Sequence, residues 1–373
     1  MSLPERGTER EHRRVRALDP LHADDLLRHL PAMNAAGDVP ALVDTLRRLV
    51  AAATPDLDAD PYRARAAMRD LGVLLGSIKR HDLEPVTEVP EVEPVLLRLA
   101  DRGDVVPRDT VHHYSVWNPH GERQRSYTGD PQESALIDSV RLSLPRLARA
   151  VDQCVPLAEA ELTSPGFLTA MGSFRADLSS LDEAIELVID RVSPAFFAQD
   201  LRPYFGDVTV GGQVWLGGAG AGLPVPLLDL TLWAADHGDA GYETFWRQGI
   251  PYALPEWRRL YPRLATGPSL VTRVSEALAK VGAAEPDPRL MAAATAVEQS
   301  MRALLGFRAK HVTVARKSYQ EDLRLFPVGS SGGSVELLAS IVRLTRDNAA
   351  LVRGRQPGGA QPDEVRAGSL SRA

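Results

Sequence analysis

The chain has 373 residues, of which 44% are hydrophobic and 25% are charged, as in an ordinary globular protein with room for two domains or one large domain plus an accessory part. Its formal net charge of −6 argues against nonspecific binding to nucleic acid, and no apolar run reaches the roughly eighteen residues that a membrane span needs. A single cysteine, Cys154, excludes a disulfide framework within the chain and suits a reducing compartment. These features predict a cytoplasmic protein that binds neither nucleic acid nor membrane.

The first part of the chain is predicted to be helical. Residues 1–16 are rich in Arg and Glu and lack the apolar core of a secretory signal, so we expect a mobile arm there. Further along, apolar residues recur at three- and four-residue steps between Pro31, Pro40 and Pro55. This spacing predicts a small N-terminal helical domain over residues 17–110.

The rest of the chain predicts further helices and one extended segment. Helical patterns cover residues 134–162 and 176–192. Residues 208–216 are typical of a short strand, and the β signal is weak elsewhere. The sequence therefore predicts an all-α fold, with a large helical domain over residues 111–353 and a disordered tail over residues 354–373.

A glycine-rich run at residues 217–222 is a candidate for contact with a ligand. Glycine lets the backbone come close to a large flat molecule, which singles out Gly218. The run fits neither the dinucleotide fingerprint nor the P-loop, because its spacing is wrong and Pro224 and Pro226 obstruct the helix that both motifs need. A nucleotide is therefore not the expected ligand.

One histidine and one glycine-serine loop near the C-terminus form the main candidate site. The helical pattern before the loop places His311 on an apolar face, with Arg308 one turn earlier. The loop, residues 329–334, ends at a new amphipathic helix, and free backbone N–H groups at such a junction, including those of Gly332 and Gly333, favour carboxylates. A b-type haem needs an axial nitrogen, a cation for one propionate and donors for the other acid group. The alternative is that the histidine is an ordinary core residue.

Several motifs, spread over the chain from about Asp19 to Val352, are shared with one known group of enzymes. They are Ala66 to Gly72 (AAMRDLG), Leu75 to His81 (LGSIKRH), Val116 to Pro119 (VWNP), Arg125 to Gly129 (RSYTG), Leu201 to Pro203 (LRP), Phe307 to His311 (FRAKH) and the glycine-serine loop. On these motifs the chain resembles the haem-dependent indole oxygenase superfamily, which includes the tryptophan and indoleamine dioxygenases. Within it, the resemblance is to the monodechloroaminopyrrolnitrin synthase family.

The resemblance implies a fold and a cofactor. The fold is an indoleamine-dioxygenase-like helical bundle that encloses a b-type haem, with a smaller N-terminal helical part. In this fold His311 is the proximal ligand of the haem iron, and Arg308 holds a haem propionate. Together with the local patterns, the resemblance makes Gly218, Gly332 and Gly333 further cofactor-binding candidates.

The resemblance also implies the substrate side of the site. Tyr319 and Ser331 match residues that meet the amino-acid end of the substrate in the synthase. Ser139, Phe197 and Arg202 match the distal side of the dioxygenase pocket, with one extra residue between the phenylalanine pair and the arginine. We therefore expect catalytic roles for Ser331, Tyr319 and Ser139, and substrate binding by Arg202, Phe197, Tyr319 and Ser331.

The implied activity is a haem-dependent oxidation of tryptophan or a chlorinated tryptophan, with dioxygen or hydrogen peroxide as oxidant and an electron donor as a candidate partner. In the synthase family, oxidation of the indole is followed by ring opening, rearrangement to an aminophenylpyrrole and decarboxylation, a step of pyrrolnitrin biosynthesis. Three alternatives stay open. They are a dioxygenase that releases N-formylkynurenine, a peroxide-dependent hydroxylase of tyrosine or another aromatic amino acid, and a haem carrier or sensor.

Overall fold

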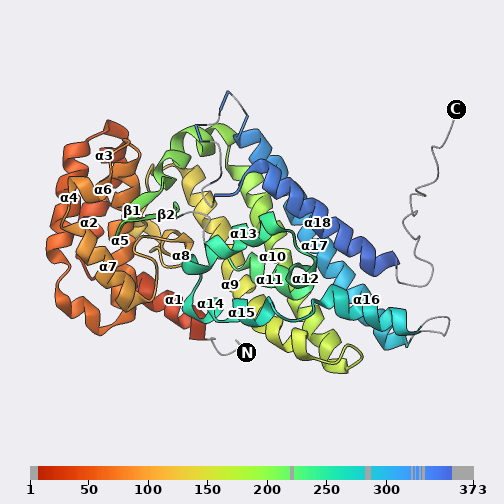
Figure 1. Cartoon of the computed structure of the whole chain (residues 1–373). Helices are drawn as coiled ribbons and strands as arrows, with labels where there is room; N and C mark the ends of the chain where they lie inside the picture. Colours follow the sequence, from red (N-terminus) through yellow and green to blue (C-terminus); the bar gives the residue numbers. More distant parts are fainter. Residues whose placement is uncertain are drawn as a thin grey trace.

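The fold is built almost entirely of helices (Figure 1). The computed structural model describes residues 7–218, 222–281, 287–320, 322–323, 325–326, 329 and 332–354. Within these ranges the only sheet is a hairpin, in which β1 (Val208–Val210) pairs antiparallel with β2 (Gln213–Trp215). The turn between them uses Gly211 and Gly212 at φ angles of 63° and 71°, which a two-residue hairpin turn favours. The expected all-helical class is confirmed.

The N-terminal helices pack around one central, fully enclosed helix. They are α1 (Gly7–Ala17), α2 (Asp24–Leu27), α3 (Leu30–Ala36), α4 (Val39–Ala52), α5 (Pro61–Lys79), α6 (Pro85–Glu88) and α7 (Val92–Gly103), with the short helix η1 (Pro55–Ala59) before α5. Every residue of α5 from Ala64 to Ile78 is buried. A helix that is buried all round is a core helix, and α5 has this place in the N-terminal part (Figure 1).

Residues 7–16 do not form the mobile arm that the sequence predicts. They lie in α1, which packs against α5 and buries His12 and Val15. These two residues are three apart and therefore share one face of the helix. Trp117 fixes that face, because its indole Nε1 donates a hydrogen bond of 2.8 Å to His12 Nδ1. The prediction is thus wrong for residues 7–16, and residues 1–6 lie outside the described part.

Four long helices form the frame of the C-terminal part. They are α9 (Pro131–Glu159), α10 (Pro165–Arg191), α17 (Pro288–Ser318) and α18 (Val335–Gly354). The first three each start at a proline that follows a capping residue, and Asp130, Ser164 and Asp287 each accept a hydrogen bond from a first-turn backbone N–H. Helix α10 packs against both α9 and α17, and α17 packs against α18 (Figure 1).

Shorter elements fill the space between the long helices. They are α8 (Val111–Tyr114), η2 (Gly121–Arg123), the π-helical η3 (Phe196–Leu201), η4 (Arg202–Phe205), α11 (Val225–Asp229), the π-helical η5 (Leu230–Ala234), α12 (Ala235–His237), α13 (Ala240–Gly249), η6 (Ile250–Tyr252), α14 (Pro255–Arg258), α15 (Leu260–Leu264) and α16 (Leu270–Val281). Of the described helices, none combines the length and apolar character needed to cross a membrane.

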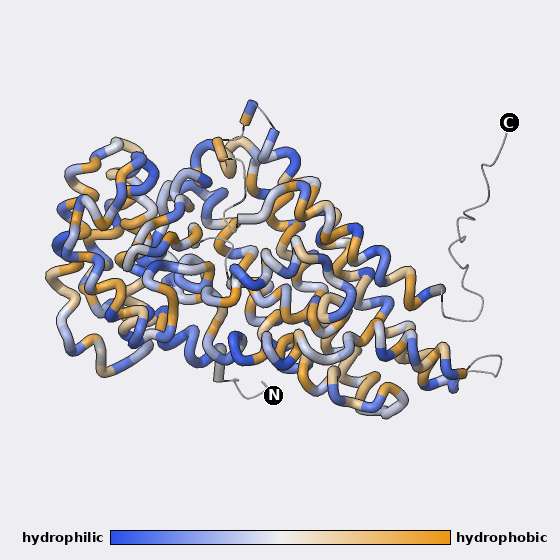
Figure 2. The backbone as a smooth tube through the Cα atoms, in the orientation of Figure 1, coloured by the Kyte–Doolittle hydropathy of each residue, from blue (hydrophilic) through white to orange (hydrophobic). Residues whose placement is uncertain are grey.

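The buried hydrophobic residues form two main clusters, and hydrophobic and hydrophilic residues alternate along the helices that supply them (Figure 2). The larger cluster lies among α9, α10, α11 and α13 to α18. The other is formed by the N-terminal helices and also takes in residues 192–210. The core therefore does not divide cleanly at the boundary predicted between residues 17–110 and 111–353, because a later segment returns to the first cluster. Residues 355–373 of the expected tail lie outside the described residues.

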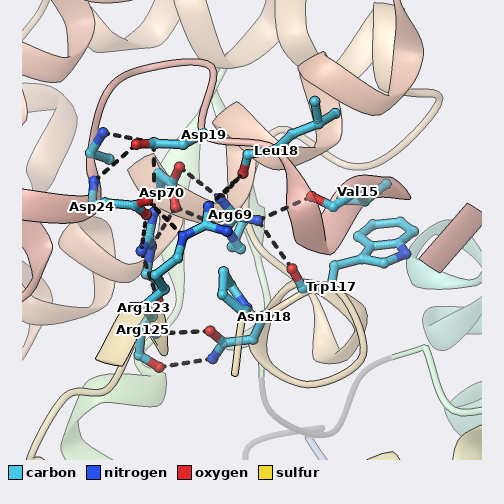
Figure 3. Close-up of polar contacts among 12 residues, drawn as sticks. Val15, Leu18, Asp19, Asp24, Arg69, Asp70, Trp117, Asn118, Arg123 and Arg125 are labelled. Carbon is cyan, nitrogen blue, oxygen red and sulfur yellow. Dashed lines mark hydrogen bonds and ion pairs between the residues drawn. The ribbon is translucent and has the colours of Figure 1, made fainter. Parts of the chain in front are cut away.

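A buried polar network connects the N-terminal part to the segment that precedes α9 (Figure 3). The guanidinium of Arg69 donates to both oxygens of Asp70, and that of Arg125 donates to Asp70 Oδ1. Asn118 pairs with the backbone N–H and carbonyl of Arg125, and Arg69 also reaches the carbonyl of Trp117. Three of the motifs that carry the family resemblance therefore meet in one network.

Candidate functional site

A large apolar cavity lies between α9, α10, α17 and α18. The empty space at this site is about 1480 Å³, a volume that includes open solvent at its mouth. Its apolar wall is formed mainly by one face of each long helix and includes Val140, Leu181, Ile185, Val188, Phe307 and Val314. None of the described lining residues is charged. A bulky, largely apolar ligand suits such an enclosure.

His311 is the one histidine among the described lining residues of this cavity. Its ring stacks on that of Phe307, one turn earlier in α17, with 5.6 Å between ring centroids. Burial lowers the pKa of His311, and the positive charge of Arg308 lowers it further. The imidazole is therefore neutral near pH 7 and keeps a nitrogen lone pair. No described residue forms a hydrogen bond with it.

Arg308 is not among the described residues that line the cavity. Its guanidinium is buried, donates to the carboxylate of Asp229 and donates at 2.5 Å to the hydroxyl of Thr345. Tyr242 and Trp233 also donate to Asp229, which completes a buried network between α11, η5, α13, α17 and α18. The structure therefore places Arg308 in this network and not in the cavity wall, where a cofactor propionate was expected to meet it.

Tyr319 is hydrogen-bonded to Arg202, which is not among the described residues that line the cavity. Tyr319 lines the cavity directly after α17. Its pKa is raised by burial, and the hydrogen bond and positive charge of Arg202 oppose that increase. The guanidinium of Arg202 also donates to the carbonyl of Phe205 and lies 4.2 Å from the ring centroid of Phe326. Ser331, the third residue predicted here, lies outside the described residues.

Ser139 and Phe197 both line the cavity. The hydroxyl of Ser139 donates a hydrogen bond of 2.7 Å to the carbonyl of Leu136, which leaves the hydroxyl oxygen able to accept one. Phe197 is half-buried in the π-helical turn η3. The two residues approach from different elements, so the structure brings the predicted distal residues to one cavity.

The predicted glycines separate into two groups. Gly333 lines the cavity, and its neighbour Gly332 is exposed with a φ of 80°. Gly329, which also lines the cavity, donates its N–H to the carbonyl of Gly333 at 2.9 Å. Gly218, by contrast, packs against Asp109, where an added Cβ would lie 2.7 Å from a carboxylate oxygen. The described residues therefore place Gly218 in a close packing contact outside the cavity wall.

Four polar residues of the cavity wall were not predicted, namely Tyr114, Ser143, Ser193 and Ser318. Ser143 lies one helical turn after Ser139, and this spacing was a usable signal. Tyr114 lies in the short helix α8, far from the other wall residues in sequence, and no local pattern indicates its place. Within the described residues, no cluster of three or more histidine, cysteine or carboxylate side chains is arranged to hold a bare metal ion.

The helical fold and its apolar cavity, with one neutral histidine in the wall, define a protein with a pocket suited to a bulky apolar ligand. A family model described as monodechloroaminopyrrolnitrin synthase PrnB matches residues 12–357. The chain therefore belongs to the monodechloroaminopyrrolnitrin synthase family and is an enzyme. Membership implies the step of pyrrolnitrin formation that converts a chlorinated tryptophan to monodechloroaminopyrrolnitrin. The resemblance inferred from the motifs is confirmed.

Proposed function

We propose that the chain binds a b-type haem through His311 and uses it to oxidise a chlorinated tryptophan, with rearrangement to an aminophenylpyrrole and loss of the carboxyl group. One observation carries the proposal. A neutral imidazole lines a large apolar cavity, and no described residue forms a hydrogen bond with it. Other buried histidines, such as His112, also leave a ring nitrogen unpaired, so it is the position of His311 in the cavity wall that supports the proposal.

The described residues fit such a cofactor in three ways. His311 would supply the axial nitrogen, and Phe307 stacks on that imidazole and limits its rotation. The apolar side chains of α9, α10 and α17 suit the flat faces of a macrocycle. The backbone of Gly329 and Gly333 lies in the wall without side chains, which leaves room at that edge. Arg308 has no part in this proposal because Asp229 binds it.

Haem, when bound, supplies the activation of dioxygen or peroxide that oxidation of an indole requires. The chain supplies binding and orientation. Arg202 and Tyr319 would hold the carboxylate of the amino acid, since Tyr319 lines the cavity and Arg202 is hydrogen-bonded to Tyr319. The Ser139 oxygen would accept the indole N–H, because its own proton is already donated to Leu136. The apolar walls would exclude water from the reacting ring.

Replacement of His311 tests the cofactor assignment. His311→Ala should abolish stoichiometric haem binding, measured as haem per chain and as the Soret absorption band of the purified protein. His237→Ala is a matched control, because His237 is only partly buried and contacts Thr272 away from the cavity. A His311→Ala protein with a full haem complement and an unchanged spectrum would show that the ligand assignment is wrong.

Product analysis tests the reaction. Haem-loaded protein is incubated with tryptophan, 7-chlorotryptophan and tyrosine, each with dioxygen or hydrogen peroxide, and the products are identified by mass spectrometry. We expect an aminophenylpyrrole from the chlorinated tryptophan. N-formylkynurenine would instead indicate a dioxygenase, a hydroxylated tyrosine would indicate a hydroxylase, and a haem spectrum without any product would indicate a carrier.

We also propose that Ser331 meets the carboxylate of the substrate, which is supported by the family match alone. Ser331→Ala should then weaken binding of the amino acid by about 1 to 3 kcal/mol, because a buried carboxylate would lose one donor. Titration of the Soret shift with the amino acid measures this affinity. An unchanged affinity would remove Ser331 from the site.

A further inference from the structure

Three tyrosine rings lie in series from the wall of the cavity toward the outside of the protein. Tyr114 of α8 lines the cavity and stacks on Tyr127, with 5.9 Å between ring centroids and 30° between ring planes. Tyr127 stacks in turn on Tyr204 of η4, with 4.6 Å between centroids and 18° between planes. The series is formed by three separate segments of the chain, so no local sequence pattern produces it.

The outer end of this series reaches a partly exposed cation. The guanidinium carbon of Arg80 lies 4.8 Å from the centroid of the Tyr204 ring. Arg80 is only half-buried and donates to the carbonyl of Asp200, which is exposed. The three rings therefore connect the cavity to a partly exposed guanidinium, and the carboxylate of Asp200 acts on the same outer tyrosine.

Close packing by a glycine maintains the middle of the series. Gly76 of α5 faces the Tyr127 hydroxyl, and a Cβ at position 76 would lie 2.6 Å from that oxygen and 2.6 Å from the carbonyl oxygen of Tyr204. The ring of Phe205 packs edge-on against both Tyr114 and Tyr127, with centroid distances of 5.3 and 5.8 Å. The rings are thus held in fixed contact and sealed by apolar groups.

The inner tyrosine has a carboxylate as its hydrogen-bond partner. The Tyr114 hydroxyl donates a hydrogen bond of 3.0 Å to Oε1 of Glu133, a buried residue. Burial and the negative charge of Glu133 raise the pKa of Tyr114 well above its ordinary value, so the phenol is not ionised near pH 7. Loss of an electron from this phenol favours loss of its proton, and Glu133 Oε1, which also accepts from the Tyr127 N–H, is the hydrogen-bonded acceptor. The other carboxylate oxygen of Glu133 is occupied by donors from Ser126 and Thr128.

We propose that Tyr114, Tyr127 and Tyr204 form a one-electron relay between the cavity and the protein surface. The proposal rests on the proposed function, because it needs an oxidant in the cavity, which peroxide supplies to the haem-loaded enzyme. Tyr114 gives one electron to that oxidant, and its O–H bond breaks as the proton forms a new O–H bond at Glu133. The product is a neutral Tyr114 phenoxyl radical.

The relay is completed by an external one-electron donor of the ferrocyanide or ascorbate class at the Arg80 end. One electron passes from the donor through the stacked rings of Tyr204 and Tyr127, which neither keep a charge nor lose a proton. The Tyr114 radical is reduced, and the proton returns to it from Glu133. In the net reaction the external donor is oxidised by one electron and the oxidant in the cavity is reduced by one electron.

The first test is electron paramagnetic resonance on haem-loaded enzyme, treated with hydrogen peroxide without any amino-acid substrate and then frozen. We expect a tyrosyl radical signal in the unaltered enzyme and its loss in Tyr114→Phe, which removes only the hydroxyl. Tyr261→Phe is the matched control, because Tyr261 is also buried and ring-stacked, on Trp246, but lies outside the relay. A signal that persists unchanged in Tyr114→Phe overturns the proposal.

The second test follows the decay of the radical after ferrocyanide is added. Tyr204→Leu should slow this decay several-fold, whereas Tyr261→Leu should not change it, and equal decay in both variants overturns the relay. Formation of the radical should also be slower in heavy water, since a proton moves to Glu133. The heavy-water measurement uses the unaltered enzyme, so it tests the proton transfer even if a variant does not fold. Equal rates in light and heavy water would contradict that transfer. Absence of haem uptake contradicts the proposed function, whereas indole oxidation without a Tyr114-dependent radical contradicts the relay alone.

Discussion

Asp70 accepts a hydrogen bond of 2.8 Å from Arg125, which is 55 residues further along the chain, and the two side chains are 0% and 3% exposed. Arg69 donates two more hydrogen bonds to the same carboxylate, at 2.9 Å each. Burial alone would raise the pKa of Asp70, but the two guanidinium groups hold it below its ordinary value. The carboxylate is therefore charged in the folded protein and anchors both arginines (Figure 3).

Replacement of this carboxylate by an amide should destabilise the whole N-terminal part. In Asp70→Asn, two buried guanidinium groups lose their only shared counter-charge at this point, and removing one partner from a buried ion pair costs about 3 to 5 kcal/mol. We expect the free energy of unfolding, measured by urea denaturation with circular dichroism, to fall by that amount.

An exposed carboxylate gives the control for this prediction. Asp190 forms an ion pair with Arg191, and both side chains are largely exposed, so Asp190→Asn should change the free energy of unfolding by less than about 1 kcal/mol. Equal effects of the two substitutions would mean that burial of the Asp70 network does not determine how much it contributes to the free energy of unfolding.

Arg308 gives a second prediction, which separates a structural role from a cofactor role. Arg308→Met should lower the free energy of unfolding by about 3 to 5 kcal/mol, because the buried carboxylate of Asp229 loses its cation. Adding Asp229→Asn removes that uncompensated charge, keeps an oxygen that can accept a hydrogen bond from Trp233, and should restore part of the stability. Haem affinity should recover together with stability in the double variant, as measured by titration with haem.

The opposite pattern would support the role that the family resemblance implies. If the double variant regains stability but binds haem as weakly as Arg308→Met alone, then Arg308 contacts the cofactor directly. The described structure argues against this, because Thr345 and Asp229 already take hydrogen bonds from the guanidinium.

Helix periodicity predicted the overall class and the helix that carries His311, because both depend on spacing within one segment. The place of Arg308 was not predictable in the same way. On an α-helix, side chains three residues apart point in directions that differ by about 60°. Since α17 packs between α10 and α18, this rotation directs His311 toward the cavity and Arg308 toward Asp229, which is 79 residues away in the sequence.

The parts of the site that depend on distant segments were outside the reach of local patterns. Tyr319 and Arg202 were assigned by family resemblance and do lie together, although no spacing rule connects them. Tyr114 was missed because α8 has only four residues and no periodicity of its own. His12 was missed because residues 1–16 are rich in charged residues, which favoured the prediction of a mobile arm. In the structure, burial of one face with His12 and Val15 is enough for this segment to pack as a helix.

The third prediction concerns two helical glycines. Replacement by alanine should change the free energy of unfolding in opposite directions at the two positions. Gly76→Ala places a Cβ 2.6 Å from the Tyr127 hydroxyl and the Tyr204 carbonyl, so α5 must shift, and we expect a loss of about 1 to 3 kcal/mol in the free energy of unfolding. Gly172→Ala in α10 meets nothing within 4 Å and should stabilise by about 0.5 to 1 kcal/mol, because alanine favours the helix. Urea denaturation of both variants measures the difference. A neutral Gly76→Ala would show that α5 and the tyrosine rings are not in close contact.

The pH dependence of stability gives the last prediction. Burial lowers the pKa of His12 from 6.5 to about 4, and the charges of Arg16 and Arg65 contribute. The unfolded chain therefore binds a proton that the folded protein excludes, so this contribution to stability is complete above pH 6.5 and is lost as the pH falls toward about 4. It amounts to about 3 kcal/mol. Urea denaturation at a series of pH values should show a shallower acid loss in His12→Gln, whose amide oxygen still accepts from Trp117 but does not titrate. An equally steep loss in that variant would assign the acid sensitivity to other groups.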